Sequence, residues 1–487
     1  MTQHVHLIGV SGTGMGALAM LFRERGDRVT GSDVSFDPPI GPALLAAGIE
    51  CLKGYAAENL ASKPDLVIVG NAIRKDNPEA MAAEAMGLTR LSMSGALREH
   101  FLAGRRAVVV AGTHGKTTTS SLAAWVLASA GLDPGYFIGG IPKNFERGAA
   151  VGRSKRSLVG DGKPAPFVIE GDEYDAVYWH KKAKFLDYIG VGPDDVVILT
   201  SVEHDHIDIY PDEASYEEAF RELLRRVPKD GLVIADASQA RVRALVGESG
   251  VRASYYALQG DDTGDVTPVW LAALANVDET GQQLFDVYVG GSSAGRFGLK
   301  LPGAHNVRNA LACIAMAGEA FAIPFGTARA ALATFGGVKR RQELLGTPNG
   351  VLVYDDFAHH PTAVDETLRA FKRRHPSARL WAIFEPRSAT ACRSLHQAAY
   401  VAAFGVADKV LLAPLGRTNI PEAERLDVAR LARDLGPNAR AADGVDDIVA
   451  RVAEEARPGD VVAVLSNGAF GGIYGKLLAA LAASPGR

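Results

Sequence analysis

The run at residues 112–118, GTHGKTT, has the residue types and spacing of a loop that binds a polyphosphate. A β-like run precedes it and an Ala/Leu-rich helical pattern follows it, so its backbone N–H groups and a helix N-terminus can face phosphate oxygens. Lys116 adds a positive charge, and the Thr117 hydroxyl can bind Mg²⁺. The usual G-x-x-x-x-G-K-[ST] spacing would put its first glycine at Val110, so the alternative is a tight turn with a solvated lysine. The candidate nucleotide-binding residues of this loop are Gly112, Thr113, His114, Gly115, Lys116, Thr117 and Thr118.

Two further polar groups each follow an apolar, strand-like run. The string EGDEYD, which contains Glu173, follows FVI, and the string TSVEHDHIDIYPD, which contains His206, follows VVIL. Carboxylates gathered at a strand end repel one another, and Mg²⁺ would offset that repulsion. An isolated acidic cluster is more often a solvated loop, and a lone histidine is more often structural. Because both groups follow a phosphate loop, we interpret them as candidate metal sites.

A fourth group lies in the string GAHNVRNALA, where Asn306 and Asn309 stand near the start of a predicted helix. Asparagine at such a position is otherwise simply a helix cap.

Short β-branched runs alternate with amphipathic stretches, a pattern typical of parallel sheets covered by helices. We predict an α/β protein with three domains, at residues 1–104, 105–334 and 335–487. The first opens as a βαβ unit with the glycine turn GVSGTGMG, whose spacing is not the G-x-G-x-x-G of a dinucleotide fold. Three β-like runs between about 266 and 301 predict a small antiparallel insertion without chemistry in the central domain.

The formal net charge of −4 offers no basic field for a phosphate backbone, so nucleic acid is not an expected partner. Three widely separated cysteines favour core thiols in a reducing compartment. No apolar run approaches a membrane span, and we expect a cytoplasmic protein.

The ordered set GxxGKTT, ExDE, DH, HNxxN and a late arginine in VKRRQE resembles the Mur ligase family across essentially the whole chain. The resemblance implies a Rossmann-like N-terminal domain for a uridine nucleotide, a central P-loop ATPase with a mostly parallel sheet, and a Rossmann-like C-terminal domain that brings the amine. It implies ATP and Mg²⁺ as cofactors of an amide-bond ligase.

The resemblance also assigns residue roles. Lys116, Glu173 and His206 would be catalytic, and Thr117, Glu173 and His206 would bind the metal. Beyond the phosphate loop, the residues for ATP would be Asn306, Asn309, Arg341 and Asp356. Those for the uridine diphosphate would be Gly12, Gly14 and the Ser32-Asp33 turn.

The finer resemblance is to the branch that joins UDP-N-acetylmuramate to L-Ala-γ-D-Glu-meso-diaminopimelate in peptidoglycan recycling. No lysine occurs between His206 and Lys229, where many family members carry a carbamylated one. The strings GDEYDAVYWHKKAKF and FEPRSAT carry the likeness, and Arg387 in the second is our candidate for a peptide carboxylate. The alternative is the L-alanine-adding ligase of peptidoglycan synthesis. A folylpolyglutamate-type ligase or a catalytically silent binding protein is a more distant alternative.

Overall fold

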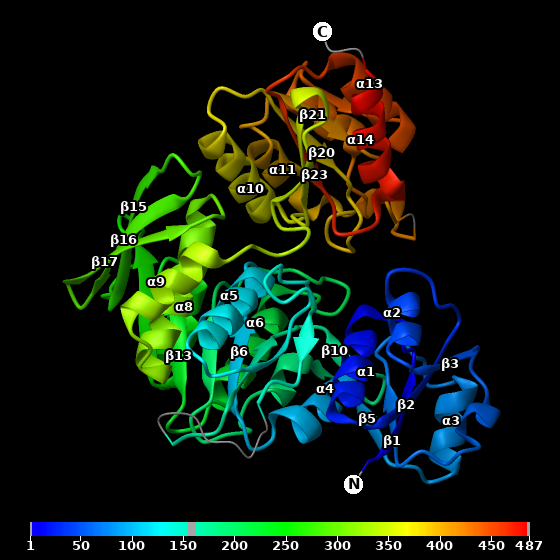
Figure 1. Cartoon of the computed structure of the whole chain (residues 1–487). Coiled ribbons are helices and arrows are strands. Elements are labelled where there is room, and N and C mark those ends of the chain that lie inside the picture. The colour runs from blue at the N-terminus through cyan, green and yellow to red at the C-terminus, as the bar shows by residue number, and fades with distance from the viewer. Residues whose placement is uncertain (1, 154–161, 418, 485–487) are drawn as a thin grey trace.

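The computed structural model describes residues 2–153, 162–417 and 419–484, and its three large sheets follow one another along the chain (Figure 1). The first sheet has five parallel strands in the order β3-β2-β1-β4-β5. They are β1 (His4–Ile8), β2 (Arg28–Asp33), β3 (Glu50–Lys53), β4 (Leu66–Val69) and β5 (Arg90–Ser92). The helices are α1 (Thr13–Arg25), α2 (Ile40–Ala46), α3 (Pro78–Ala85) and α4 (Met93–Leu97).

The second strand of this domain ends at two of the residues predicted for the uridine diphosphate. Ser32 and Asp33 are the last two residues of β2, and the chain turns only after them. Parallel pairing with β1 and β3 carries β2 through both residues.

The central sheet has ten strands in the order β17-β16-β15-β14-β13-β12-β6-β9-β7-β8. The strands are β6 (Arg106–Ala111), β7 (Gly135–Phe137), β8 (Ala149–Ala150), β9 (Pro166–Glu170), β12 (Val196–Leu199), β13 (Leu232–Asp236), β14 (Ala253–Leu258), β15 (Trp270–Val277), β16 (Gln283–Val289) and β17 (Ser292–Leu299). The helices are α5 (Lys116–Ser129), α6 (Glu213–Arg225), α7 (Ala240–Ser249), α8 (Ala304–Phe321) and α9 (Phe325–Thr334). A separate hairpin joins β10 (Asp175–Val177) to β11 (His180–Ala183).

The antiparallel strands between residues 266 and 301 are not a separate unit. β15 pairs in parallel with β14, and β16 and β17 then add antiparallel strands at the same edge. The expected insertion is therefore an extension of the central sheet.

Alternating residues of the central strands explain how two helical layers cover one sheet. Val108 and Val110 of β6 belong to the core beneath α5 and α8, whereas Val109 belongs to the core beneath α6 and α7. Successive strand side chains point to opposite faces, so an all-apolar strand buries both. The second of these cores continues into α1 and α4, which joins the first domain to the central one.

The third sheet has six strands in the order β18-β19-β23-β20-β21-β22, parallel except for β18. They are β18 (Glu343–Gly346), β19 (Leu352–Asp356), β20 (Leu380–Phe384), β21 (Lys409–Leu412), β22 (Ala439–Ala441) and β23 (Val461–Leu465). The helices are α10 (Pro361–Arg374), α11 (Gln397–Ala403), α12 (Val428–Leu435), α13 (Val445–Glu455) and α14 (Ile473–Ala483).

The carboxyl ends of β6, β9 and β12 lie at one edge of the central sheet because these neighbouring strands are parallel. The phosphate loop, the acidic string and the histidine string follow these three ends, and open α/β sheets bind ligands at this edge. No helix in the described part of the chain is long and apolar enough to cross a bilayer.

Candidate active site

The phosphate loop between β6 and α5 contains two glycines whose backbone would not suit a side chain. Gly112 has φ +130°, and a Cβ there would lie 2.3 Å from Thr200 Oγ1. Gly115, the N-cap of α5, has φ +79°. Left-handed conformations of this kind favour glycine, which has no Cβ. The loop thus makes a tight strand-to-helix turn that opens toward the N-terminus of α5.

Thr200 and Ser201 hold this loop from the end of β12. The Thr200 hydroxyl donates to the carbonyl oxygen of His114 at 2.6 Å, and Ser201 Oγ accepts from the His114 N–H at 3.0 Å. The Ser201 carbonyl accepts from Thr113 N at 3.0 Å. Sequence reasoning gave neither residue this role. The available signal was their position directly after an apolar strand.

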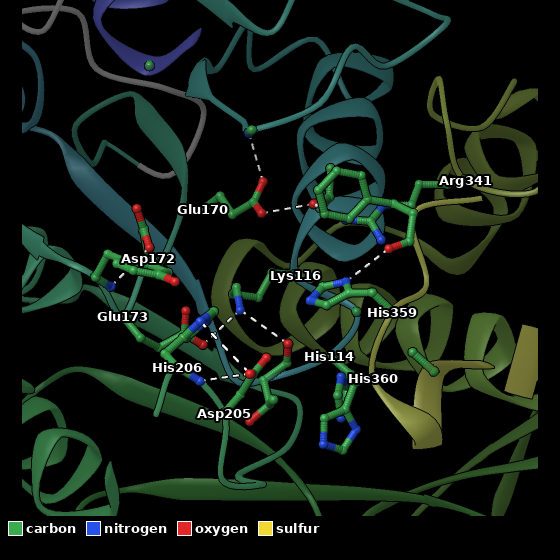
Figure 2. Close-up of a pocket in the computed structure, with 18 of the residues that line it drawn as sticks. His114, Lys116, Glu170, Asp172, Glu173, Asp205, His206, Arg341, His359 and His360 are labelled. Atoms are coloured by element: carbon green, nitrogen blue, oxygen red, sulfur yellow. Dashed lines mark hydrogen bonds and ion pairs between the residues drawn. The ribbon is translucent and has the colours of Figure 1, made fainter. Parts of the chain in front are cut away.

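Lys116 is enclosed by oxygen acceptors (Figure 2). Its Nζ donates to Glu173 Oε1 at 2.7 Å, to Gly112 O at 2.6 Å and to Thr113 O at 3.2 Å. The Lys116 side chain is 15% exposed and that of Glu173 only 1%. Burial alone would lower the pKa of Lys116, but the Glu173 carboxylate outweighs burial and raises it, so the ammonium keeps its charge. The structure therefore brings two predicted catalytic residues into direct contact.

The Thr117 hydroxyl connects the central domain to the segment that enters the third. It donates to Glu170 Oε1 at 2.8 Å and accepts from Arg341 Nη2 at 3.1 Å. Glu170 also accepts from Gly139 N at 2.8 Å. Burial lowers the pKa of Arg341, although Asp356 opposes this. Glu170 was not among the site residues chosen from the sequence, although it begins the acidic string.

His206 and Asp205 lie on the loop after β12 and line the same cavity as Lys116 and Glu173. The His206 ring lies with its centroid 4.4 Å from that of the Tyr174 ring, at a tilt of 55°. Asp205 Oδ1 accepts from the backbone N–H of His206 at 2.7 Å and from Thr390 Oγ1 at 2.6 Å. Burial alone would raise the pKa of Asp205, but His206, His359 and the Thr390 hydroxyl lower it well below its ordinary value. A fixed carboxylate therefore joins the histidine loop to the third domain.

A cavity of about 370 Å³ lies between the three domains and collects most of these groups. Figure 2 shows Lys116, Glu173 and His206 on one side of it and Arg341 and His359 on the other. Its wall also includes Thr113, His114, Gly115, Thr117, Thr13 and Gly14.

A smaller cavity adjoins the other side of the phosphate loop. Its lining includes Thr118, Asn306, Asn309, Arg341 and Asp356, all of them predicted for ATP. Asn306 Nδ2 donates to Pro302 O at 2.7 Å. Asp356 accepts from Gln342 N at 2.7 Å and from Ala358 N at 2.8 Å. The structure therefore places Asn306, Asn309, Arg341 and Asp356 together beside the loop.

Of the four residues predicted for the uridine diphosphate, only Gly14 lines the main cavity. Gly12 is the N-cap of α1, two residues before Gly14. Asp33 accepts from Ser11 N at 2.8 Å and from Tyr55 Oη at 3.2 Å, so it holds the glycine turn. Ser32 is fully buried and its hydroxyl has no hydrogen-bond partner. Tyr55 was missed by the sequence analysis, and burial and Asp33 raise its pKa to about 12.

Arg387 does not line either cavity. It is exposed, follows β20, and lies against Gly416 and Gly468 in the loops after β21 and β23. Arg417 Nε donates to its carbonyl oxygen at 3.0 Å. It thus stands at the carboxyl edge of the third sheet.

The donor set around Lys116 fits Mg²⁺. Glu170, Asp172 and Glu173 line the same cavity as Thr117, and oxygen ligands suit this ion. Glu173 is paired with Lys116, and Asp172 with Lys184 at 2.7 Å. A bound cation would therefore compete with Lys116 for Glu173. The His206 imidazole would add one nitrogen ligand to this oxygen-rich set.

Three family models together match most of the chain. The model described as Mur ligase family, catalytic domain, matches residues 4–105, the Mur ligase middle domain residues 110–317, and the Mur ligase, glutamate ligase domain, residues 340–468.

Full-length relatives agree with these matches. UDP-N-acetylmuramate–L-alanyl-γ-D-glutamyl-meso-2,6-diaminoheptandioate ligase of Escherichia coli K12 is 37% identical over 98% of both chains. UDP-N-acetylmuramate–L-alanine ligase of Sorangium cellulosum is 32% identical over 96% of this chain and 94% of its own. The crystal structure of a murein peptide ligase from Psychrobacter arcticus superposes with a TM-score of 0.71, at 33% identity and over 100% of both chains.

Proposed function

The chain belongs to the Mur ligase family of ATP-dependent ligases, and from this premise we propose that it joins UDP-N-acetylmuramate to L-Ala-γ-D-Glu-meso-diaminopimelate. The observation that carries the proposal is the similarity to the Escherichia coli ligase of that name, which extends through the third domain. The reaction would return a cell-wall tripeptide to the precursor pool. Its need for ATP and a nucleotide-linked sugar supports the cytoplasmic location expected from the sequence.

The first chemical step would be attack of the lactyl carboxylate on the γ-phosphate of ATP. Lys116 is aimed at the phosphate loop and keeps its charge, so it can stabilise the negative charge of the transition state. Thr117, Glu173 and His206 would hold Mg²⁺, which supplies positive charge between the reacting anions. The asparagines and Asp356 beside the loop would hold the rest of the nucleotide.

The second step would be attack of the peptide amine on the acyl phosphate. Arg341 and Thr390 already bring the third domain against the central one, through Thr117 and Asp205. Such closure excludes the water that would otherwise hydrolyse the acyl phosphate. The leaving group is inorganic phosphate, and the amine loses a proton as the amide forms.

Ligation of free L-alanine is the second candidate, because relatives with that activity in their names match at similar length. The deciding experiment compares kcat/KM for the tripeptide with kcat/KM for L-alanine at saturating ATP and UDP-N-acetylmuramate. The proposal expects a large preference for the tripeptide. Equal or better use of L-alanine would assign the chain to the biosynthetic branch.

Arg387 is our proposed contact for a tripeptide carboxylate, because a planar guanidinium at the carboxyl edge of a sheet can bind a carboxylate through two hydrogen bonds. Arg387→Ala should raise KM for the tripeptide by about tenfold or more, while KM for ATP stays within about twofold. Arg369→Ala, which removes an exposed arginine on α10, is the matched control. An unchanged tripeptide KM would remove Arg387 from the peptide site.

A further inference from the structure

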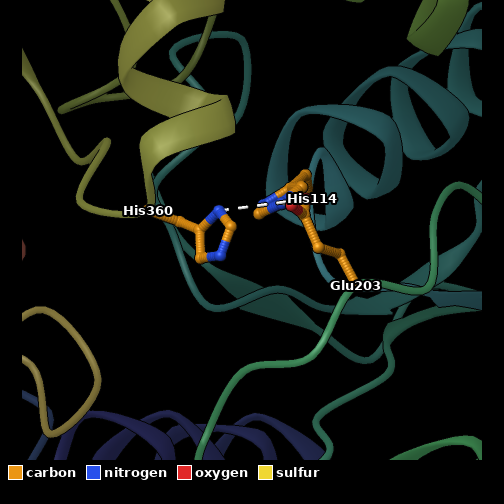
Figure 3. Close-up of side chains that lie close together, drawn as sticks. All are labelled: His114, Glu203 and His360. Atoms are coloured by element: carbon orange, nitrogen blue, oxygen red, sulfur yellow. Dashed lines mark hydrogen bonds and ion pairs between the residues drawn. The ribbon is translucent and has the colours of Figure 1, made fainter. Parts of the chain in front are cut away.

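Three side chains, His114, Glu203 and His360, meet beside the phosphate loop (Figure 3), and two of them, His114 and His360, also line the main cavity. His114 Nε2 lies 2.7 Å from Glu203 Oε2, and His360 Nδ1 lies 3.8 Å from the same oxygen. One ligand atom from each residue lies within 4.8 Å of the other two. Within residues 2–153, 162–417 and 419–484, this is the one group of three or more His, Cys, Asp or Glu side chains with that property.

His360 is the least satisfied member of the group. Its side chain is 4% exposed, yet neither ring nitrogen has a hydrogen-bond partner. Buried polar atoms are nearly always hydrogen-bonded, so an orphaned imidazole facing a carboxylate and a second imidazole indicates a missing ligand.

We propose that His114, Glu203 and His360 form a site for a transition-metal dication of the Zn²⁺ class, separate from the Mg²⁺ site. Two imidazoles and one carboxylate are a common zinc ligand set, whereas Mg²⁺ favours oxygen ligands. A tetrahedral ion would need the three ligand atoms about 3.3 Å apart, so the His114–Glu203 hydrogen bond opens and His360 moves in. The fourth position is left for water.

Glu203 is positioned for this role. Its other oxygen, Oε1, accepts from the Thr362 hydroxyl at 2.9 Å, which leaves Oε2 facing the histidines. A hydrogen bond of this kind orients a carboxylate for a metal. Glu203, Thr362 and His396 also line a cavity of about 500 Å³ whose lining does not include Lys116, and this cavity offers the ion a path from solvent.

The site spans two domains. His114 belongs to the phosphate loop, Glu203 follows β12, and His360 is the N-cap of α10 in the third domain. A bound ion would therefore tie the third domain to the phosphate loop. An active site closed between domains must open to release its product, so occupancy should slow turnover without displacing Mg²⁺.

The first test uses Co²⁺ as a visible probe on the full chain, in excess Mg²⁺ and without ATP. We expect one Co²⁺ per chain with the absorption of nitrogen and oxygen ligands, displaced by Zn²⁺. His360→Gln and Glu203→Gln should each weaken binding by about tenfold or more. His204→Gln is the control, because that ring is engaged with Tyr210 O at 2.9 Å and lies in the same loop as Glu203.

Circular dichroism and thermal unfolding establish that each variant is folded. If either His360→Gln or Glu203→Gln fails to fold, the Co²⁺ affinity of the folded variant tests the site, because the two variants remove ligands from different domains. Wild-type affinity in the folded variant, or an equal loss in His204→Gln, would overturn the site.

The second test measures turnover at saturating MgATP with free Zn²⁺ set by a chelator buffer. Zn²⁺ should inhibit the wild type with an inhibition constant that added Mg²⁺ leaves unchanged, and His360→Gln should raise that constant by about tenfold. If Mg²⁺ relieves the inhibition, or if Zn²⁺ inhibits His360→Gln as strongly as the wild type, Zn²⁺ acts at the magnesium site. Either result would overturn the proposed site at His114, Glu203 and His360.

Discussion

At Lys116 the structure places one ammonium group among a carboxylate and two carbonyl oxygens. Burial alone would lower the pKa of Lys116, but the Glu173 carboxylate raises it, so the ammonium keeps its charge. A polyphosphate carries more negative charge than Glu173 alone. We therefore expect Lys116 to exchange Glu173 for phosphate oxygens when Mg²⁺ takes up the carboxylate.

Lys116→Ala should lower kcat by at least about 10²–10³, because it removes a charge aimed at the transferred phosphoryl group. Steady-state turnover with a folding check by circular dichroism measures this. Lys181→Ala, which removes an exposed lysine paired with Asp175, should leave turnover unchanged. Retention of more than about a tenth of wild-type turnover in Lys116→Ala would refute the ATP-site assignment.

Glu173→Gln and His206→Asn should each raise the Mg²⁺ concentration that gives half-maximal activity by about tenfold or more, since each removes a proposed ligand. The measurement is a Mg²⁺ titration of turnover at saturating substrates. Asp208→Asn provides a control, because this exposed carboxylate lies two residues beyond His206. Unshifted titrations for both variants would make Glu173 and His206 structural residues.

At the scale of the element, β9 and β13 of the central sheet each end in a carboxylate, Glu170 and Asp236, that accepts hydrogen bonds from a loop. Asp236, the last residue of β13, shows this most clearly, because its carboxylate accepts from Ser238 N at 2.9 Å and from Ser238 Oγ at 2.7 Å while only 3% of the residue is exposed. Burial raises the pKa of Asp236 to about 6, although the Ser238 hydrogen bonds and Arg308 oppose it.

Because its pKa is raised, Asp236 lowers the free energy of unfolding once the pH is high enough for the buried carboxyl to ionise. Its folded pKa exceeds the unfolded value of about 3.9, so its contribution to stability is fully present below about pH 4 and is lost as pH rises through about 6. Asp236→Asn removes the charge and keeps an oxygen acceptor.

This variant should raise the free energy of unfolding at pH 7 by roughly 1–3 kcal/mol, and the gain should shrink toward pH 4. Urea denaturation across that pH range measures it. The exposed Asp230 supplies the control Asp230→Asn, which should show no such pH dependence. A gain that is constant with pH would mean that the charge of Asp236 is not its cause.

At the scale of the whole molecule, the third domain reaches the central site through a few polar contacts. Arg341 contacts Thr117, Thr362 contacts Glu203, and Thr390 contacts Asp205. Thr390 and Asp205 are both buried, so their hydrogen bond is shielded from water. Loss of such a bond costs about 1–3 kcal/mol, which is enough to shift a domain equilibrium by about 5- to 150-fold.

Thr390→Val should therefore favour the open domain and increase the ratio of phosphate released to amide formed, because water reaches the acyl phosphate before the amine does. Parallel assays of phosphate and amide product measure this ratio. Thr347→Val, the same change at an exposed site in the same domain, should leave it unaltered. A wild-type ratio in Thr390→Val would show that this contact does not hold the domain closed.

The sequence by itself determined those features that depend on local spacing. Gly112, Gly115 and Lys116 mark a phosphate loop because strand, glycine turn and helix follow within a few residues, and backbone conformation there depends on near neighbours. Alternating apolar runs and helical patterns predicted the three-domain α/β class for the same reason. The order of the motifs along the chain was enough to indicate the family.

Only the tertiary structure decided which distant side chains are partners. Thr200 holds His114 across 86 residues, and Arg341 meets Thr117 across 224. The strands at 266–301 joined the central sheet, and Arg387 lay outside the cavities, because strand order and loop direction depend on packing over the whole core. The cluster of His114, Glu203 and His360 has no local signal at all, since its members come from three separate segments. Local patterns predict the elements, but the contacts between their ends arise only when parallel pairing and domain docking bring those ends to one edge.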